Sequence, residues 1–451
     1  MTGSPEHPGF TARLKSRTVG DERARFVYLN NFEVERSWGR DDRGLPGAAL
    51  SFSSVLVNRM EEVCVLLADQ DDLVILKAPV DPHYLDHLRS LGAAAGDHLL
   101  VDDNDVERSV TRDALASPRL LAELAGLADG RTYLMPLGIS ADEEELAART
   151  GLPLAGPDAK ICRHVNGKIF SRELVDRTGL TPVPGKVCRT LGELESALLT
   201  HLELADQVVV KESLGVSGRG MTVLGNSSRA ERLVRMLGRH GSTTDLSFVV
   251  EEWISRRCDL NYQFIMDRDG GVHFETVRTA LTRNGVHRGH ILPPDLDPDQ
   301  IEQIAAAAQV IGSALAAEGY YGLAGVDAMV GTDGVLYPCL EINARFNMAT
   351  YQNRLVERLL PPGSHAMATV FDLRTRRPYG YGEVRRALAD LMFNAGRGVL
   401  VNNFATLNAS VEAGKAPRGR LYAVCAGGSP AEVKDIRDRA EIALTRMVET
   451  A

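Results

Sequence analysis

Apolar runs alternate with helix-like segments over residues 25–155, and this alternation limits the fold more than any other feature of the chain. Four short apolar runs bounded by Asp, Asn or Gly are predicted strands: residues 25–30, 63–67, 73–76 and 99–101. Two stretches between them have helical spacing, 82–91 and 114–127, and residues 134–137 and 142–150 suit a last strand and a closing helix. Strands and helices that alternate in this way form a parallel sheet covered by helices. We therefore predict an α/β domain over residues 1–157.

Length and charge exclude several classes of protein. A chain of 451 residues is too long for one hydrophobic core, so two or three domains are expected. The net charge of −9 opposes general nucleic-acid binding, and no apolar run is long enough to span a bilayer. The first residues lack the apolar stretch of a secretory signal, and the six cysteines are scattered without a Cys-x-x-Cys pair. We expect a cytoplasmic protein with no membrane or nucleic-acid partner.

The second half of the chain predicts a different organisation. A helix is expected at 159–178, and residues 184–254 form a small strand–helix unit that resembles a mobile lid. Glycine-containing turns then predict two hairpins, 261–266 with 272–276 and 325–330 with 335–342, separated by a long helix at 298–317. Residues 365–451 predict a small α/β extension that begins with a basic stretch.

A glycine-rich segment follows an apolar strand that ends in Lys211. It contains Gly215, Ser217, Gly218 and Gly220. Glycines let backbone N–H groups approach phosphate oxygens, and a neighbouring lysine adds positive charge. The segment has neither the Lys-Ser/Thr ending of a P-loop nor the helix start of a dinucleotide-binding loop. It is a candidate phosphate loop, with an ordinary glycine turn after an edge strand as the alternative.

Two carboxylates and an amide fall on the predicted hairpin of residues 325–342. Glu341 and Asn343 are two residues apart and share one face of their strand, and Asp327 joins that face if the turn is odd-numbered or bulged. Oxygen ligands of this kind suit Mg²⁺ bound together with nucleotide phosphates. Arg345 continues the face and could contact phosphate or a developing oxyanion. The alternative is a polar hairpin face that meets solvent.

An apolar strand also runs into the sequence Glu251-Glu252-Trp253-Ile254. The backbone groups of this hinge could read the edge of an adenine, and Asp259, a few residues on, could accept ribose hydroxyls. Trp253 could equally be a core residue.

A basic segment without Asp or Glu extends from residue 277 to residue 294. It carries Arg278, Arg283, His287, Arg288 and His290. In an acidic chain such a segment is a candidate anion pocket, with a basic solvent-facing loop as the alternative.

Taken in order along the chain, these segments resemble the ATP-grasp superfamily. The resemblance covers residues 168–345 and rests on Lys168 in Asn-Gly-Lys-Ile-Phe, the Val-Val-Lys strand with its glycine loop, the Glu-Glu-Trp-Ile hinge and the Asp…Glu-x-Asn-x-Arg hairpin. Residues 25–155 resemble the Rossmann-like pre-ATP-grasp domain. The resemblance implies a mixed α/β (α+β) fold with a pre-ATP-grasp domain at 1–157 and an ATP-grasp domain at 158–364, its lid at about 184–254. The C-terminal extension, 365–451, would complete the acceptor site.

The resemblance also implies how ATP would bind. Lys168 and Lys211 would hold the α- and β-phosphates, and the loop from Gly215 to Gly220, including Ser217 and Gly218, would cover the triphosphate. Glu251, the backbone of Glu252 and Ile254, and the neighbouring Trp253 would surround the adenine, and Asp259 would bind the ribose.

The same resemblance implies the chemistry. Asp327, Glu341 and Asn343 would ligate two Mg²⁺ ions, for which Mn²⁺ could substitute, and Arg345 would steady an acyl phosphate. In this superfamily the γ-phosphoryl group of ATP passes to a carboxylate, and an amine then displaces phosphate. We thus expect an ADP-forming carboxylate–amine ligase that forms a homodimer.

Some features narrow the expectation. Gly325 stands where some dipeptide-forming relatives carry an arginine, so Arg288 or Arg345 would replace that charge. No lysine has the Met-Lys-Met context of biotin attachment, which disfavours a carboxylase. The chain is similar to the actinobacterial peptide ligases of the pheganomycin type, which in Streptomyces join a guanidino acid to the amino end of a peptide in antibiotic biosynthesis. A ligase or carboxylase for a small metabolite and a non-catalytic ATP-binding protein are the alternatives.

Overall fold

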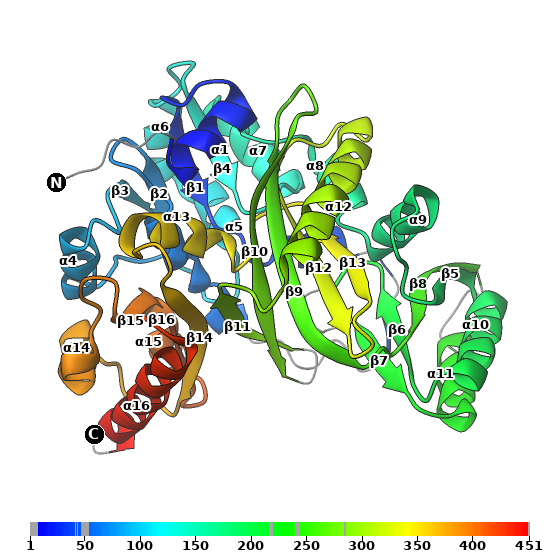
Figure 1. The fold of residues 1–451 in the computed structure, drawn as a ribbon. Coiled ribbons are helices and arrows are strands. Elements are labelled where there is room, and N and C mark those ends of the chain that lie inside the picture. The colour runs from blue at the N-terminus through cyan, green and yellow to red at the C-terminus, as the bar shows by residue number, and fades with distance from the viewer. Residues whose placement is uncertain are drawn as a thin grey trace.

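The computed structural model describes residues 8–40, 42, 44–46, 54–215, 220–239, 244–283 and 286–449. Three sheets organise them, two of four strands and one of eight. In Figure 1 the eight-stranded sheet lies between the N-terminal sheet and the small sheet of residues 185–252. None of the described helices is both long and apolar enough to cross a membrane.

The N-terminal sheet is parallel, as the alternating pattern predicts. Its strands, in the spatial order β3-β2-β1-β4, are β1 (Arg25–Leu29), β2 (Leu73–Leu76), β3 (Asp97–Leu100) and β4 (Thr132–Pro136). Its helices are α1 (Phe10–Val19), α2 (Val34–Trp38), α3 (Ser54–Val57), α4 (Pro82–Ser90), α5 (Val110–Leu115), α6 (Pro118–Ala125) and α7 (Ala141–Thr150).

Two predictions in this region are wrong. Residues 63–67 are not a strand: a 3₁₀ helix, Met60–Leu66, ends just before Leu67, and its residues 61–66, including Glu61 and Glu62, are buried. A short apolar run does not distinguish a buried strand from a buried helical turn. The helix expected at 114–127 is two helices, because Pro118 begins a new helix after the break at Ser117.

Glu62 joins this 3₁₀ helix to the C-terminal part of the chain. Its Oε1 accepts hydrogen bonds from the backbone N–H groups of Phe404 (2.7 Å) and Ala405 (2.8 Å). Burial raises the pKa of the Glu62 carboxyl to about 7. Since burial favours the neutral form, the ionised carboxylate destabilises the folded state.

We expect Glu62→Gln to stabilise the protein at alkaline pH. The pKa of Glu62 in the folded protein lies above its ordinary value of 4.5, so the stability of the natural protein falls as the pH rises from about 4.5 to 7 and stays lower above that range. Glutamine keeps the accepting oxygen without the charge, and the gain should be about 1–3 kcal/mol at pH 8 and close to zero at pH 4.5. Urea unfolding at both pH values measures this, with the exposed Glu123→Gln as control. An equal gain at both pH values would contradict the explanation.

The helix predicted at 159–178 is interrupted. It consists of α8 (Ala159–Val165) and α9 (Lys168–Thr178), and Gly167 is the N-cap residue of α9. Lys168 is therefore the first residue of a helix, where its backbone N–H has no partner within the helix and donates to the carbonyl of Ser213 (2.8 Å).

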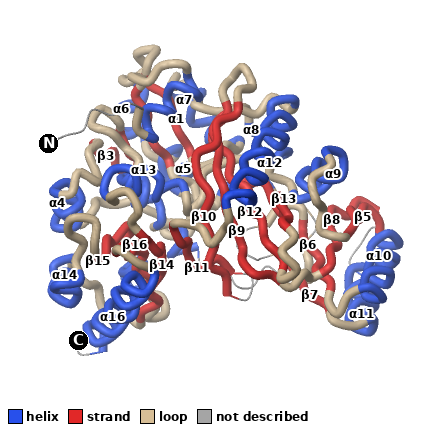
Figure 2. The backbone as a smooth tube through the Cα atoms, viewed as in Figure 1, coloured by secondary structure: helices blue, strands red, loops and turns tan. Residues whose placement is uncertain are grey.

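The following unit has the predicted strand–helix order and its own core. Its antiparallel strands, in the order β5-β8-β6-β7, are β5 (Gly185–Thr190), β6 (Val208–Glu212), β7 (Met221–Leu224) and β8 (Thr244–Glu252). Helices α10 (Leu191–Leu204) and α11 (Ser227–Arg239) pack together beside this sheet (Figure 2). An apolar cluster separate from the main core fills the unit, and Leu45 from the N-terminal part joins it. A separate core is what a lid that moves as one body requires.

The central sheet is antiparallel and includes the C-terminal strands. Its order is β13-β12-β9-β10-β11-β14-β16-β15, with β9 (Arg256–Met266), β10 (Val272–Arg283), β11 (Val286–Leu292), β12 (Gly322–Gly331), β13 (Leu336–Asn343), β14 (His365–Leu373), β15 (Gly398–Asn403) and β16 (Gly419–Gly427). Its helices are α12 (Pro298–Ala317), α13 (Thr350–Leu359), α14 (Tyr381–Leu388), α15 (Ala405–Glu412) and α16 (Pro430–Glu449). The C-terminal extension is thus α/β as predicted, but its strands continue the central sheet and form no sheet of their own.

Candidate active site

Two carboxylates from neighbouring strands meet on one face of the central sheet. Asp327 of β12 and Glu341 of β13 are direct partners in the antiparallel ladder, so their side chains point to the same side. Asn343 Nδ2 donates to one oxygen of Asp327 (3.2 Å), and Asn261 Nδ2 donates to the other (2.7 Å). The structure therefore brings together the three residues expected to ligate metal, and their role as ligands stays a prediction.

The chemistry of this group suits a divalent cation. Burial and the neighbouring Glu341 raise the pKa of Asp327 to about 6, because both disfavour its negative charge, which a bound cation would stabilise. Within the part of the chain that the structure describes, no group of three or more His, Cys, Asp or Glu could hold a metal ion. A metal here would therefore depend on two carboxylates, the Asn343 amide oxygen and the oxygens of a bound phosphate, as is usual for Mg²⁺.

Lys168 reaches these carboxylates from the start of α9. Its Nζ lies 2.7 Å from Glu341 Oε1 and donates to the carbonyl of Gly215 (3.0 Å), and its side chain is only 4% exposed. One ammonium group therefore contacts both the carboxylate pair and the first residue of the glycine loop.

Lys211, on strand β6 of the lid, is also paired with a carboxylate. Its Nζ lies 2.5 Å from Glu251 Oε2 on the neighbouring strand β8, and Arg172 of α9 lies 3.6 Å from the other oxygen of Glu251. Burial raises the pKa of the Cys339 thiol on β13, the carboxylates of Glu251, Asp327 and Glu341 raise it further, and Lys211 lowers it. Charges of the lid and of the central sheet thus act on the same residue of β13.

The hinge residues are held mainly by the lid. Glu252 pairs with His201 of α10 (3.0 Å), and the Trp253 backbone N–H donates to the carbonyl of Gln207 (2.9 Å). The Trp253 ring is partly buried under the guanidinium of Arg256, 4.5 Å from the ring centroid. Arg256 also pairs with Asp259 (2.8 Å). Trp253 is therefore neither a fully buried core residue nor an exposed platform.

An apolar cluster lies next to the hinge that the sequence did not single out. Val183, Met329 and Tyr337 form its buried part, and Ile254 and Leu340 pack against it. Met329 and Tyr337 face each other across β12 and β13. Residues from the lid entrance, the hinge and the carboxylate hairpin thus form one apolar cluster.

The glycine loop is only partly within the described residues, which include Gly215 and Gly220 but not Ser217 and Gly218. Gly220 has a φ of +71°, and a Cβ there would collide with the Glu212 carboxylate. Its backbone carbonyl accepts from the Glu212 N–H (2.7 Å). Glycine is required here by conformation and by space together.

Arg345 contacts an acid from the other end of the chain. Its Nε donates to Glu35 Oε1 of α2 (2.6 Å), Nη2 contacts the same oxygen, and Nη2 also donates to Asn343 Oδ1 (2.9 Å). Glu35 was absent from the predicted site because 310 residues separate it from Arg345.

Arg288 is not brought to this site, which corrects the expectation that it replaces a charge at Gly325. It lies on β11, and β9 and β10 separate that strand from β12. Its guanidinium pairs with Asp372 of β14 (2.7 Å). A Cβ at Gly325 would collide with the Asn347 amide, so that amide occupies the space where a longer side chain would begin. In the same basic segment, Arg278 is buried and donates hydrogen bonds to Gln352 and Asn353 (both 2.5 Å), and burial lowers the pKa of His287 to about 4.

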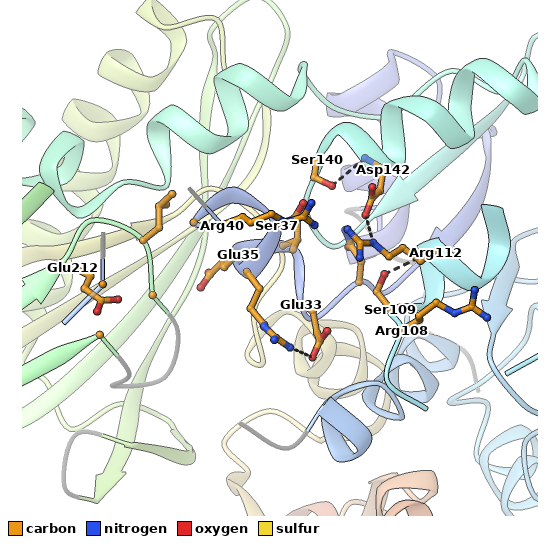
Figure 3. A pocket seen from close by; sticks show the side chains of 18 of the residues that line it. Glu33, Glu35, Ser37, Arg40, Arg108, Ser109, Arg112, Ser140, Asp142 and Glu212 are labelled. Carbon is orange, nitrogen blue, oxygen red and sulfur yellow. Dashed lines mark hydrogen bonds and ion pairs between the residues drawn. The ribbon is translucent and has the colours of Figure 1, made fainter. Parts of the chain in front are cut away.

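A cavity of about 670 Å³ lies beside Glu35. Figure 3 shows Glu35, Ser37 and Arg40 between Glu212 of the lid and the group that contains Arg112 and Asp142. Gly215 also lines the cavity, so its wall includes a contact of Lys168 as well as the acid bound to Arg345. The cavity therefore adjoins the carboxylates and lysines on the side of the N-terminal domain.

Two known domain families match the sequence of this chain. The pre-ATP-grasp domain family matches residues 60–152, and the ATP-grasp domain family matches residues 189–345. The [butirosin acyl-carrier protein]–L-glutamate ligase of Niallia circulans is 26% identical over 66% of this chain and 67% of its own length. The biotin carboxylase of Pseudomonas aeruginosa is 30% identical over 29% of this chain and 30% of its own length.

Solved structures agree on the fold. The biotin carboxylase of Campylobacter jejuni in complex with β-γ-ATP has a TM-score of 0.58 at 16% identity, covering 94% of this chain and 95% of that one. The biotin carboxylase domain dimer of the Hydrogenobacter thermophilus 2-oxoglutarate carboxylase, with MgADP and bicarbonate, has a TM-score of 0.55 at 17% identity, covering 92% and 89%. With its pre-ATP-grasp domain followed by an ATP-grasp domain, this chain belongs to the ATP-grasp superfamily.

Proposed function

We propose that the chain is an ADP-forming carboxylate–amine ligase that activates a carboxylate as its acyl phosphate and transfers the acyl group to an amine. The observation that carries the proposal is the contact of Lys168 with Glu341 (2.7 Å) and with Gly215 (3.0 Å). It joins a candidate phosphate lysine, a candidate metal ligand and the glycine loop in one place. In this position Lys168 would contact the phosphates of an ATP whose metal ion Glu341 would hold.

Separate groups of residues would bind the phosphates, the adenine and the metal ions. Lys168 and Lys211 hold the phosphates of ATP, and the apolar cluster of Val183, Met329 and Tyr337 with Ile254 and Leu340 holds its adenine. Asp327, Glu341 and Asn343 would hold two Mg²⁺ ions. Bound Mg²⁺ neutralises charge on the phosphates during transfer.

Arg345 lies next to Asn343 and donates hydrogen bonds toward the cavity side. From there it would stabilise the oxyanion that develops when the acyl phosphate is attacked. In the structure the Arg345 guanidinium already binds an anionic oxygen, that of the Glu35 carboxylate.

The cavity supports an amine acceptor with charged groups. Acidic and arginine side chains both line it, which fits an amino acid or peptide with an ammonium and a carboxylate. The relative from Niallia circulans is named for joining L-glutamate to a carrier protein. We propose a non-proteinogenic acid, such as a guanidino acid, joined to the amino end of a peptide in secondary metabolism, by an enzyme that acts as a homodimer.

The similarity to biotin carboxylases favours a second candidate, a ligase or carboxylase that acts on a small metabolite. Both candidates use ATP in the same way, so the second substrate decides between them.

Phosphate release is expected only when an acid and an amine are both present. L-glutamate and guanidino acids would be combined with amino acids and short peptides at fixed ATP and Mg²⁺, and products identified by mass spectrometry. Each amine would also be tested with bicarbonate as the only acid, which detects a carboxylase. ADP formed at the same rate without any amine would rule out the ligase.

A further inference from the structure

Glu35 has a carboxylate oxygen that is buried without a partner. The residue is 7% exposed, and Arg345 holds its Oε1. Among the described residues nothing donates to its Oε2, which is also shielded from solvent. An unpaired buried carboxylate oxygen is unfavourable and needs an explanation, such as a catalytic role or a bound water or ion. Glu35 also lines the 670 Å³ cavity, so a small rotation of its carboxylate would bring Oε2 to a donor on a molecule bound there.

The charges around the cavity indicate which donor this is. Of the described residues that line it, six are acidic and four are arginines. Three of these arginines are already paired with carboxylates, Arg36 with Glu33 (3.1 Å), Arg108 with Asp113 (3.0 Å) and Arg112 with Asp142 (2.9 Å). The balance is negative, which favours a cation such as an ammonium group.

The position of Glu35 indicates where that cation would lie. Arg345 faces it from the end of the carboxylate hairpin, and Glu341 and Lys168 act on it electrostatically from β13 and α9. On its own segment, Glu33 and Arg36 pair with each other. Glu35 therefore contacts Arg345, which would hold the acyl phosphate, and also lines the cavity that would hold the acceptor. Figure 3 shows it among the other side chains of the cavity wall.

We propose that Glu35 binds the ammonium group of the acceptor and takes a proton from it before the amine attacks. This role rests on the proposed ligase function. The ammonium gives one proton to Glu35 Oε2 and becomes a neutral amine. Its nitrogen lone pair forms the C–N bond to the carbonyl carbon of the acyl phosphate. The C–O bond to the phosphoryl group breaks, its electron pair stays on phosphate, and the second N–H proton leaves with the phosphate.

The protonation behaviour of Glu35 is suited to this task. Burial raises its pKa above the ordinary value, and Glu341 raises it further, while Arg345 and Lys168 oppose the shift. A carboxylate with a raised pKa is a better proton acceptor near neutral pH than an exposed one.

The test separates the amine step from the phosphoryl step. Glu35→Gln keeps an oxygen to accept from Arg345 and removes the base. It would be assayed with the acid and amine that give product in the phosphate-release screen, and with hydroxylamine replacing that amine. Hydroxylamine is unprotonated at neutral pH and needs no base to attack an acyl phosphate. We expect amide formation to fall about 100-fold, as for other lost general bases, with hydroxamate formation within about 3-fold of the natural enzyme. The decline of kcat/KM for the amine at acidic pH should become weaker.

Two further variants make the result decisive. Arg345→Lys should slow both reactions, because Arg345 acts on the acyl phosphate itself, and Glu145→Gln on the exposed face of α7 should slow neither. If Glu35→Gln slows both reactions equally, Glu35 only positions Arg345 and the proposal is wrong. It is also wrong if amide formation is unchanged. If the natural enzyme forms neither amide nor hydroxamate with any acid, the proposed function itself fails.

Discussion

Replacement of Glu341 by glutamine is expected to lower ATP-dependent turnover about 100- to 1000-fold, the range found when one charge-stabilising group is removed from an active site. Glutamine has nearly the same shape, but it removes the negative charge that pairs with Lys168 (2.7 Å) and the second acid beside Asp327. A divalent cation would then be held by one carboxylate and an amide. The loss should appear mainly as a higher requirement for Mg²⁺ and a lower kcat.

This is measured by phosphate release over a range of Mg²⁺ concentrations. High Mg²⁺ should restore part of the rate, because weaker binding can be overcome by concentration. Glu302→Gln, on the exposed face of α12, is the matched control and should behave like the natural protein. Turnover of Glu341→Gln within about 3-fold of the natural protein would show that Glu341 is not a metal ligand, since a lost metal ligand typically reduces activity far more.

Replacement of Lys168 by methionine is expected to lower kcat/KM for ATP about 100-fold or more, because a buried, preorganised charge at the phosphates is lost. Methionine keeps most of the apolar stem, so the packing at the start of α9 should survive. The ammonium that joins Glu341 to the carbonyl of Gly215 disappears, and both the phosphate contact and the anchor of the glycine loop are lost together.

The readouts are kcat and KM for ATP, with thermal unfolding as a check on folding. Raising Mg²⁺ should not rescue this variant, in contrast to Glu341→Gln, because the metal ligands are intact. Lys160→Met on the exposed surface of α8 is the control. A rise in KM for the amine alone, with ATP kinetics unchanged, would place Lys168 in the acceptor site and would falsify its assignment to ATP.

Much of the fold could be predicted because it depends on local patterns. Strand–helix alternation gave the N-terminal parallel sheet, and hairpin turns gave the pairing of β9 with β10 and of β12 with β13. The placement of Asp327 opposite Glu341 follows from the same pairing. In the hairpins the strands that meet are close in sequence, so turn residues are sufficient to predict their pairing. In the parallel sheet the alternation predicts the type of sheet, although β1 pairs with the distant β4.

The rest depends on distant segments. Glu35 could not be found from sequence, because an acid in a short helix looks like any solvent-facing residue until Arg345 lies against it. Met329 and Tyr337 look like ordinary core residues of strands, and only their packing against Ile254 of the hinge makes them candidates for contact with the adenine. For Arg288 the local sequence suggested a site residue, and the strand order of the sheet places it elsewhere. A basic residue in an acid-free segment suggests a site, but strand order places it against Asp372.

The pairing of β14 with β11 sets a limit on how the protein can be shortened. β11 has β10 on one side and β14 on the other, and the hydrogen-bonded partners across this border include His290 with Ala368. A fragment that stops at residue 364 would leave the outer side of β11 with unsatisfied peptide groups. Open strand edges recruit other strands, so such a fragment should self-associate instead of serving as a minimal catalyst.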